Sequence, residues 1–227
     1  MGLMSMLWHT LQEQKETEQR QQEAEKMTKE AELFKLRQQL QPHFLFNSLN
    51  SISALIGSKP EQARHMIYQL SDFLRGTLKR EEHQWNSLKE ELQYLWLYLD
   101  IEKVRFGHRL KTKVECAEEA QELKLPSLLL QPIVENAIKF GLYDTIDDVE
   151  ITIDALVGNG DLVIEVKNPF DAETAQPLSG TGFGLASVKR RLYLLFGRHD
   201  LLKTEAKDDI FTIKVTIPQI VSQPVNI

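Results

Sequence analysis

QPHFLFNSLN, at residues 41–50, places a histidine inside what is otherwise a long apolar helical pattern. At about 100° per residue, the apolar side chains of residues 33–56 gather on one broad arc. His43 falls just off the edge of this arc, and Asn47 lies one turn further along beside it. The pattern predicts an imidazole that packs against a core and keeps one nitrogen accessible. A surface histidine next to a proline kink is the alternative that this stretch alone leaves open.

The segment before His43 is strongly charged. Residues 11–32 are dominated by Glu, Gln, Lys and Arg, with opposite charges at i,i+4 spacing. We expect residues 1–32 to form a solvated helix with a weak coiled coil that tightens toward His43. A frayed charged linker is the alternative. Pro42 removes one helical hydrogen bond, so we expect the helix to bend or loosen just before the histidine.

The composition excludes several classes of protein. The chain has 227 residues, 42% hydrophobic and 26% charged, which is enough for a buried core and two modest domains. A net charge of −6, without a basic cluster interleaved with aromatics, argues against nucleic acid as a partner. The single cysteine, Cys116, excludes an internal disulfide and fits a reducing cytosol. No apolar run approaches the roughly 20 residues that a membrane helix needs.

A second amphipathic helix follows the first after the turn at residues 57–60. Its apolar stripe comprises Ala63, Met66, Ile67, Leu70, Phe73, Leu74 and Leu78. Two such helices joined by a short turn predict an antiparallel hairpin over residues 33–84. Because its first helix is apolar around more than half of its circumference, we expect a second copy to cover it. The prediction is a homodimeric four-helix bundle.

The remainder of the chain predicts an α+β fold. Ser87 and Glu90 form a capping box for a connecting helix within residues 85–109. Residues 110–220 then show two-residue alternation, with a hairpin turn at Gly158-Asn159-Gly160. The predicted strands are residues 110–116, 149–156, 161–167 and 210–217, and the helices among them are 125–141 and 185–197, each closed by a glycine. Hairpin-paired strands covered on one face by helices predict an α/β sandwich rather than a doubly wound parallel sheet.

Two clusters in this last region could bind a phosphorylated ligand. Glu135, Asn136 and Lys139 place an acid, an amide and a cation within one helical turn, a set that can hold hydrated Mg²⁺ and a phosphate. An ordinary surface ion pair of Glu135 with Lys139 is the alternative. The glycine-rich residues 179–184 lead directly into a helix and fit a flexible lid over a nucleotide better than a Rossmann turn or a P-loop. One of Lys189, Arg190 and Arg191 could reach a phosphate near that helix start.

Three motifs at these separations make the chain resemble the LytS-type sensor histidine kinases. QPHFLFNSLN is similar to their phosphoacceptor motif, LLLQPIVENAIKFG to the N box of their Bergerat-type (GHKL) ATP-binding domain, and GTGFGL to its G box. The resemblance runs from about Leu33 to Ile217. It implies that His43 accepts the γ-phosphate of ATP, and that Asn47 orients water for dephosphorylating the regulator. The candidate ATP- and Mg²⁺-binding residues are Glu135, Asn136 (metal), Lys139, Asn168, Gly180, Thr181, Gly182, Gly184, Leu185 and Lys189.

The resemblance also implies partners and a location. It predicts a homodimer that passes phosphate to an aspartate of a response regulator, with ATP and Mg²⁺ as cofactors and no nucleic acid. The chain would be the cytoplasmic portion of a bacterial inner-membrane protein, with its membrane sensor region upstream.

One position departs from the pattern of many histidine kinases, and two depart from the pattern of this family. Phe44, rather than an acid that could act as a base, follows His43, as in this family generally. Phe140 stands where histidine often follows the N-box lysine, and Asn168 replaces the aspartate that reads adenine. These changes leave open a dimeric scaffold that binds nucleotide but does not transfer phosphate. A simple GHKL-type ATPase is disfavoured because it gives His43 and the hairpin no role.

Overall fold

The structure is a computed structural model in which two compact units, residues 1–46 and 47–227, are distinguished. It describes Lys15, Glu18 and residues 42–79, 85–142, 147–170 and 183–219. The predictions for the charged segment, for residues 33–41 and for Gly180, Thr181 and Gly182 therefore lie outside the described residues. No helix in the described ranges is both long and apolar enough to cross a membrane.

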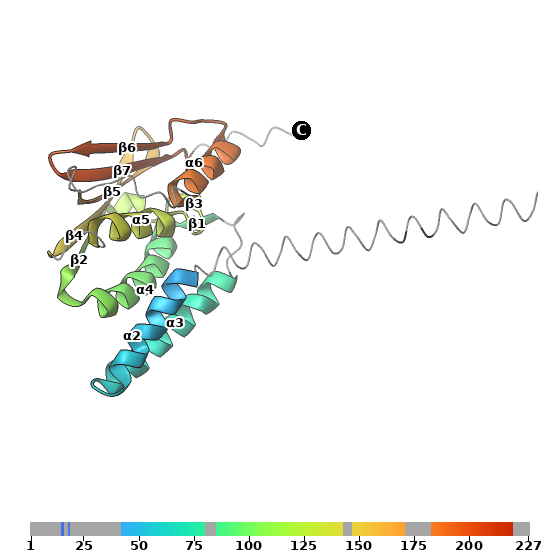
Figure 1. Cartoon of the computed structure of the whole chain (residues 1–227). Coiled ribbons are helices and arrows are strands. Elements are labelled where there is room, and N and C mark those ends of the chain that lie inside the picture. Colours follow the sequence, from blue (N-terminus) through green and yellow to red (C-terminus); the bar gives the residue numbers. More distant parts are fainter. Residues whose placement is uncertain are drawn as a thin grey trace, which may run out of the picture. The chain divides into compact units, whose positions relative to one another are not determined.

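The first two helices follow each other through a tight turn. These are α2 (Pro42–Ile56) and α3 (Pro60–Lys79) in Figure 1. The turn is closed by a hydrogen bond of 2.8 Å from Lys59 N to Leu55 O. Four residues of the predicted α3 stripe are buried, namely Ala63, Met66, Leu70 and Phe73. Ile67 and Leu78, which were expected in the same stripe, are 46% and 55% exposed in the single chain.

The predicted capping box begins α4 (Leu88–Phe106). Glu90 N donates to Ser87 Oγ at 3.2 Å, and Ser87 N donates to Glu90 Oε2 at 2.8 Å. The helix ends at Gly107, where φ is +63°, a value that suits glycine. A single 3₁₀ turn, η1 (Gly107–Arg109), then leads into the sheet. Both ends of α4 are thus determined by local sequence signals, and the signal at its start was predicted.

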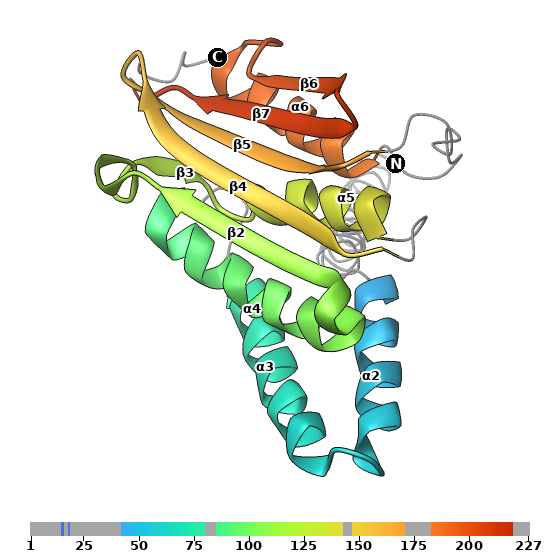
Figure 2. The ribbon, with the colours of Figure 1, turned by 90° about the vertical axis from the view of Figure 1, so that its left-hand side faces the viewer.

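A five-stranded mixed sheet forms the centre of the second half of the chain (Figure 2). Its strand order is β2 (Leu110–Cys116), β4 (Val149–Gly158), β5 (Asp161–Pro169), β7 (Ile210–Ile217) and β6 (Leu202–Lys207). β2 pairs with β4 in parallel, and the other three pairings are antiparallel. The turn between β4 and β5 has φ +55° at Asn159 and +84° at Gly160, which confirms the predicted hairpin. The sequence did not predict β6, because LKTEAK lacks apolar alternation.

The helix predicted over residues 125–141 is shorter at its start. Residues 124–126 instead form β3 (Lys124–Pro126), which pairs with β1 (Trp85–Ser87), and α5 begins only at Leu130 (Leu130–Leu142). The prediction that Gly141 closes this helix is also wrong, because Gly141 lies inside it. A Cβ at Gly141 would come within 2.9 Å of Val149 Cγ1, so close packing on β4 explains this glycine. In α6 (Phe183–Phe196), by contrast, Gly197 does follow the last turn, with φ +67°.

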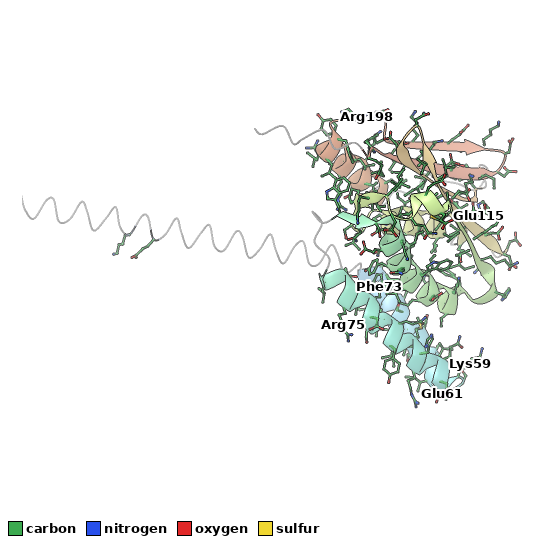
Figure 3. All side chains as sticks on the ribbon, turned by 180° about the vertical axis from the view of Figure 1, so that it is seen from behind. Lys59, Glu61, Phe73, Arg75, Glu115 and Arg198 are labelled. Carbon is green, nitrogen blue, oxygen red and sulfur yellow. The ribbon has the colours of Figure 1, made fainter. Side chains whose placement is uncertain are left out.

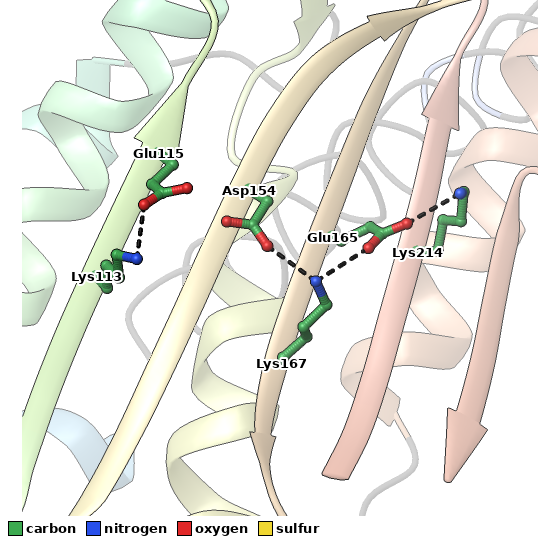
Figure 4. A network of polar contacts seen from close by, with 6 residues as sticks. All are labelled: Lys113, Glu115, Asp154, Glu165, Lys167 and Lys214. Carbon is green, nitrogen blue, oxygen red and sulfur yellow. Dashed lines mark hydrogen bonds and ion pairs between the residues drawn. The ribbon is translucent and has the colours of Figure 1, made fainter. Parts of the chain in front are cut away.

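The two faces of the sheet differ in chemistry. Burial alternates along β4, where residues 149, 151, 153 and 155 are buried. Helix α5 packs on β4 and β5, and α6 packs on α5 and β6. The opposite face carries ion pairs, in which Lys167 Nζ lies 2.9 Å from Asp154 Oδ2 and 3.2 Å from Glu165 Oε2 (Figure 4). The structure therefore confirms an α+β fold in which N-terminal helices precede a mixed sheet domain.

Candidate functional site

His43 lies in the first turn of α2, the helix that starts at Pro42. A proline suits this position, because its missing N–H belongs to a helix end where no partner is required. His43 is exposed, whereas the next residue, Phe44, is 4% exposed. Asn47, one turn further along the helix, is partly buried. An imidazole at an exposed helix start is accessible to a reactive ligand.

Helix α5 separates an apolar face from a polar one. Ile133 and Ala137 on its apolar face are fully buried. Glu135, Asn136 and Lys139 are partly exposed, and they lie within one turn of the helix. Lys139 Nζ also lies 5.4 Å from the ring centre of Phe140. The three polar side chains therefore lie close together on the partly exposed side of one helix.

Asn168 lies near the end of β5, next to the last turns of α5. A Cβ built at Gly141 would be 3.7 Å from Asn168 Cβ, an ordinary contact distance, so Asn168 packs directly against this part of α5. Asn168 is 1% exposed, and its Nδ2 donates to Pro169 O at 2.8 Å. Its buried Oδ1 has no hydrogen-bond partner within the described residues. A buried acceptor without a donor costs about 1–3 kcal/mol, so this amide oxygen suits a ligand that supplies an N–H.

The start of α6 lies against the other end of α5. A Cβ at Gly184 would be 3.6 Å from Pro132 O, so the chain after the glycine-rich segment approaches the α5 backbone closely. Gly184 and Leu185 are partly exposed, and Lys189 is exposed. Arg191 of the predicted basic group donates to Ser127 O at 2.6 Å, which ties α6 to the loop before α5. The end of β5 and the start of α6, which are far from α5 in the sequence, thus both lie against it.

The amino-acid sequence of this chain is similar to those of known proteins. A model of the histidine kinase family matches residues 31–110, which include His43, α2, α3 and α4. Sensor histidine kinase BtsS of Escherichia coli strain K12 is 36% identical over 182 residues, which cover 80% of this chain and 32% of that protein. The chain belongs to the LytS-type sensor histidine kinases. Sensor protein LytS of Staphylococcus epidermidis is 30% identical over 198 residues, covering 82% of this chain and 34% of that protein.

This LytS-type chain spans about a third of the length of the curated relatives it matches. Among solved structures, the catalytic domain of histidine kinase ThkA is similar, with a TM-score of 0.46 and 17% identity. That match covers 61% of this chain and 98% of the ThkA domain.

Sequence reasoning missed several charged residues of the LytS-type chain that support α5. Glu91 of α4 accepts two backbone N–H groups at the start of α5, and Arg109 Nη2 donates to Leu142 O at its end, 3.0 Å away. Opposite charges at the two ends of a helix suit its dipole. Glu91 occurs among the buried residues Leu88 and Leu95 at helical spacing. An acid inside an apolar stripe was the available signal, because such a residue needs a buried partner.

A second buried acid of α4 lies near the polar face of α5. Glu102 is 2% exposed, and its Oε2 lies 3.3 Å from Arg105 Nη1. Burial raises the pKa of Glu102 to about 7, while Arg105 opposes the rise and the charge of Glu135 adds to it. The electrostatic environment of Glu135 is therefore set partly by α4.

Proposed function

We propose that this chain is the phosphotransfer part of a two-component sensor histidine kinase. An imidazole nitrogen of His43 attacks the γ-phosphorus of ATP, forming a P–N bond as the bond to the β-phosphate oxygen breaks and ADP leaves. An aspartate of a response regulator then takes the phosphoryl group from His43. Because the reaction consumes ATP, this part of the protein belongs in the cytoplasm.

The observation that carries this proposal is the set of polar groups gathered along α5. Asn136 would ligate Mg²⁺, Glu135 would lie beside it, and Lys139 would neutralise phosphate charge. Bound Mg²⁺ supplies charge neutralisation at the phosphates. Among the described residues, no group of three or more His, Cys, Asp or Glu could hold a metal ion. The smaller set of Asn136, Glu135 and Lys139 still fits Mg²⁺, because Mg²⁺ keeps several waters and takes few protein ligands when it binds with nucleotide phosphates.

We also propose that the chain acts as a homodimer. Large apolar side chains remain exposed on both hairpin helices, including Leu49 at 54% and Ile56 at 61% on α2 and Ile67 at 46% on α3. Exposed apolar side chains repeated along two helices favour burial against another protein surface. A second hairpin would cover them and complete a four-helix bundle.

The nucleotide would bind in a Bergerat-type sandwich formed by the sheet and its helices.

Labelling with γ-labelled ATP and Mg²⁺ tests the proposal directly. Transfer to histidine produces a phosphoramidate, so the label should resist alkali and be lost in acid. ATP binding without label would favour the nucleotide-binding scaffold, to which Phe140 and Asn168 point as departures from the family pattern. Absence of both binding and label would overturn the proposed function.

Asn47→Ala is expected to leave autophosphorylation close to that of the unmodified protein and to slow dephosphorylation of the regulator. A neutral amide one turn from His43 can orient a water molecule but cannot accept its proton. The two rates are measured separately, with labelled ATP and with the phosphorylated regulator. Equal dephosphorylation rates in the two proteins would mean that Asn47 only packs within α2.

Asn168→Ala is expected to weaken ATP binding and to reduce discrimination against GTP. The Oδ1 of Asn168, which no group of the described residues contacts as a donor, suits the amino group of adenine, whereas guanine presents a carbonyl there. Asn168→Asp should bind ATP as tightly or up to about tenfold more tightly, because a carboxylate accepts a stronger hydrogen bond. Calorimetric titrations of the three proteins with ATP and GTP measure both effects. Identical affinities throughout would place adenine recognition elsewhere.

A further inference from the structure

Glu91 connects α4 to the first residues of the helix that carries the candidate ATP site. Its Oε2 accepts from Leu128 N at 3.1 Å, and its Oε1 accepts from Leu130 N at 3.2 Å. The carboxylate is 1% exposed, so water does not compete for these bonds. Leu130 is the first residue of α5, and Leu128 has a φ of +60°. Glu91 therefore fixes an unusual backbone turn and the start of α5 at the same time.

Tyr94, three residues later on α4, connects the same helix to α3 of the hairpin. Its ring stacks on Phe73, which is labelled in Figure 3, with centroids 5.2 Å apart and planes inclined by 16°. Its hydroxyl is hydrogen-bonded to Thr77 Oγ1. Both hydroxyls also reach Phe73 O, which lies 2.9 Å from Thr77 Oγ1 and 3.4 Å from the Tyr94 hydroxyl oxygen. The two side chains and this carbonyl of α3 therefore form one buried polar cluster.

Gly76 makes this contact unusually close. A Cβ at Gly76 would lie 2.8 Å from Cε2 of the Tyr94 ring and 3.2 Å from its Cδ2. Both distances are shorter than ordinary contacts between carbon atoms. Tyr94 is 3% exposed and stacked on Phe73, so its ring has little room to move. Helices α3 and α4 are therefore in tight contact at this level.

We propose that Glu91 is a positioning residue of the ATP site and that α3 controls it through Tyr94. Residues three apart on a helix are neighbours on its surface, so α4 joins the two contacts over less than one turn. When α3 moves, Tyr94 displaces α4, and Glu91 moves the start of the helix that carries Glu135 and Asn136. The inference rests on the proposed function, because its readout is ATP affinity. It adds a physical link by which the hairpin adjusts nucleotide binding.

Gly76→Ala tests the link from outside the ATP site. We expect the dissociation constant for ATP of the full chain to rise about fivefold, near the low end of typical coupling between sites. Alanine forms helices better than glycine, so weaker binding would not reflect loss of α3. Gly57→Ala is the matched control, because nothing lies within 4 Å of a Cβ there. It should bind ATP as the unmodified protein does.

A double-mutant cycle distinguishes coupling from simple loss of stability. Glu91→Gln removes the charge but keeps one acceptor oxygen, and it should weaken ATP binding by itself. If the two contacts act in series, the double variant Gly76→Ala/Glu91→Gln loses less ATP affinity than the product of the two single losses predicts. Circular dichroism checks that each variant is folded. If Gly76→Ala does not fold, Thr77→Val replaces it, because valine removes the hydroxyl without adding volume.

Unchanged ATP affinity in a folded Gly76→Ala or Thr77→Val variant would overturn the inference and leave the proposed function intact. Strictly multiplicative effects in the double variant would also overturn it. If the unmodified chain binds no ATP, the proposed function and this inference fall together.

Discussion

A His43→Gln variant is expected to take up no label from γ-labelled ATP while binding ATP as tightly as the unmodified chain. The amide nitrogen of glutamine shares its lone pair with the carbonyl group, whereas an imidazole nitrogen can attack phosphorus. His43 is exposed, so its replacement should change the free energy of unfolding by no more than about 0.5 kcal/mol. The expected loss is therefore confined to phosphate transfer.

His65→Gln provides the matched control for this experiment. His65 is an exposed histidine on α3, and it lies outside the phosphoacceptor motif. Its variant should label at the rate of the unmodified protein, with label of the same acid sensitivity. Label retained in His43→Gln, or lost only in His65→Gln, would show that His43 is not the acceptor.

Replacing Glu102 by glutamine is expected to change how the stability of the fold depends on pH. The pKa of Glu102 is raised to about 7 in the folded chain, against 4.5 for an ordinary glutamate. Between these values the folded chain holds a proton that the unfolded chain releases, so the free energy of unfolding falls as pH rises. From pH 5 to pH 8 this single group should remove roughly 2 to 3 kcal/mol. Glutamine remains neutral, so Glu102→Gln should lose this component.

Urea unfolding of both proteins at pH 5 and pH 8 measures the effect. The stability of the variant relative to the unmodified chain should improve by roughly 2 to 3 kcal/mol between the two pH values. Glu122→Gln, an identical change at an exposed position, should leave the pH dependence as it is. An equal difference at both pH values would mean that Glu102 is ionised throughout this range in the folded chain.

Local sequence patterns predicted the elements that depend on nearby residues. The capping box at Ser87 and Glu90, the turn at residues 158–160 and four buried residues of the α3 stripe were found as predicted. Strand β6 and the short β1–β3 pair were not, because their residues have no strong alternation and gain strand geometry only from their partners. The roles of the predicted site residues, from His43 to Lys189, remain predictions.

By itself, the sequence determined the order of the longer helices and of four strands of the sheet, the helical placement of His43, and the polar turn of Glu135, Asn136 and Lys139. Each of these depends on residues within a turn or two, so periodicity and capping are sufficient to find them. Only the tertiary structure decided that Asn168 lies against Gly141, and that Glu91 holds the start of α5. These contacts join residues that are 27 and 37 or more positions apart, so they depend on how α4, α5 and β5 pack. Local motifs therefore predict which residues of the chain could react or bind. The contacts that hold the candidate ATP site in place depend on burial and close packing between distant elements.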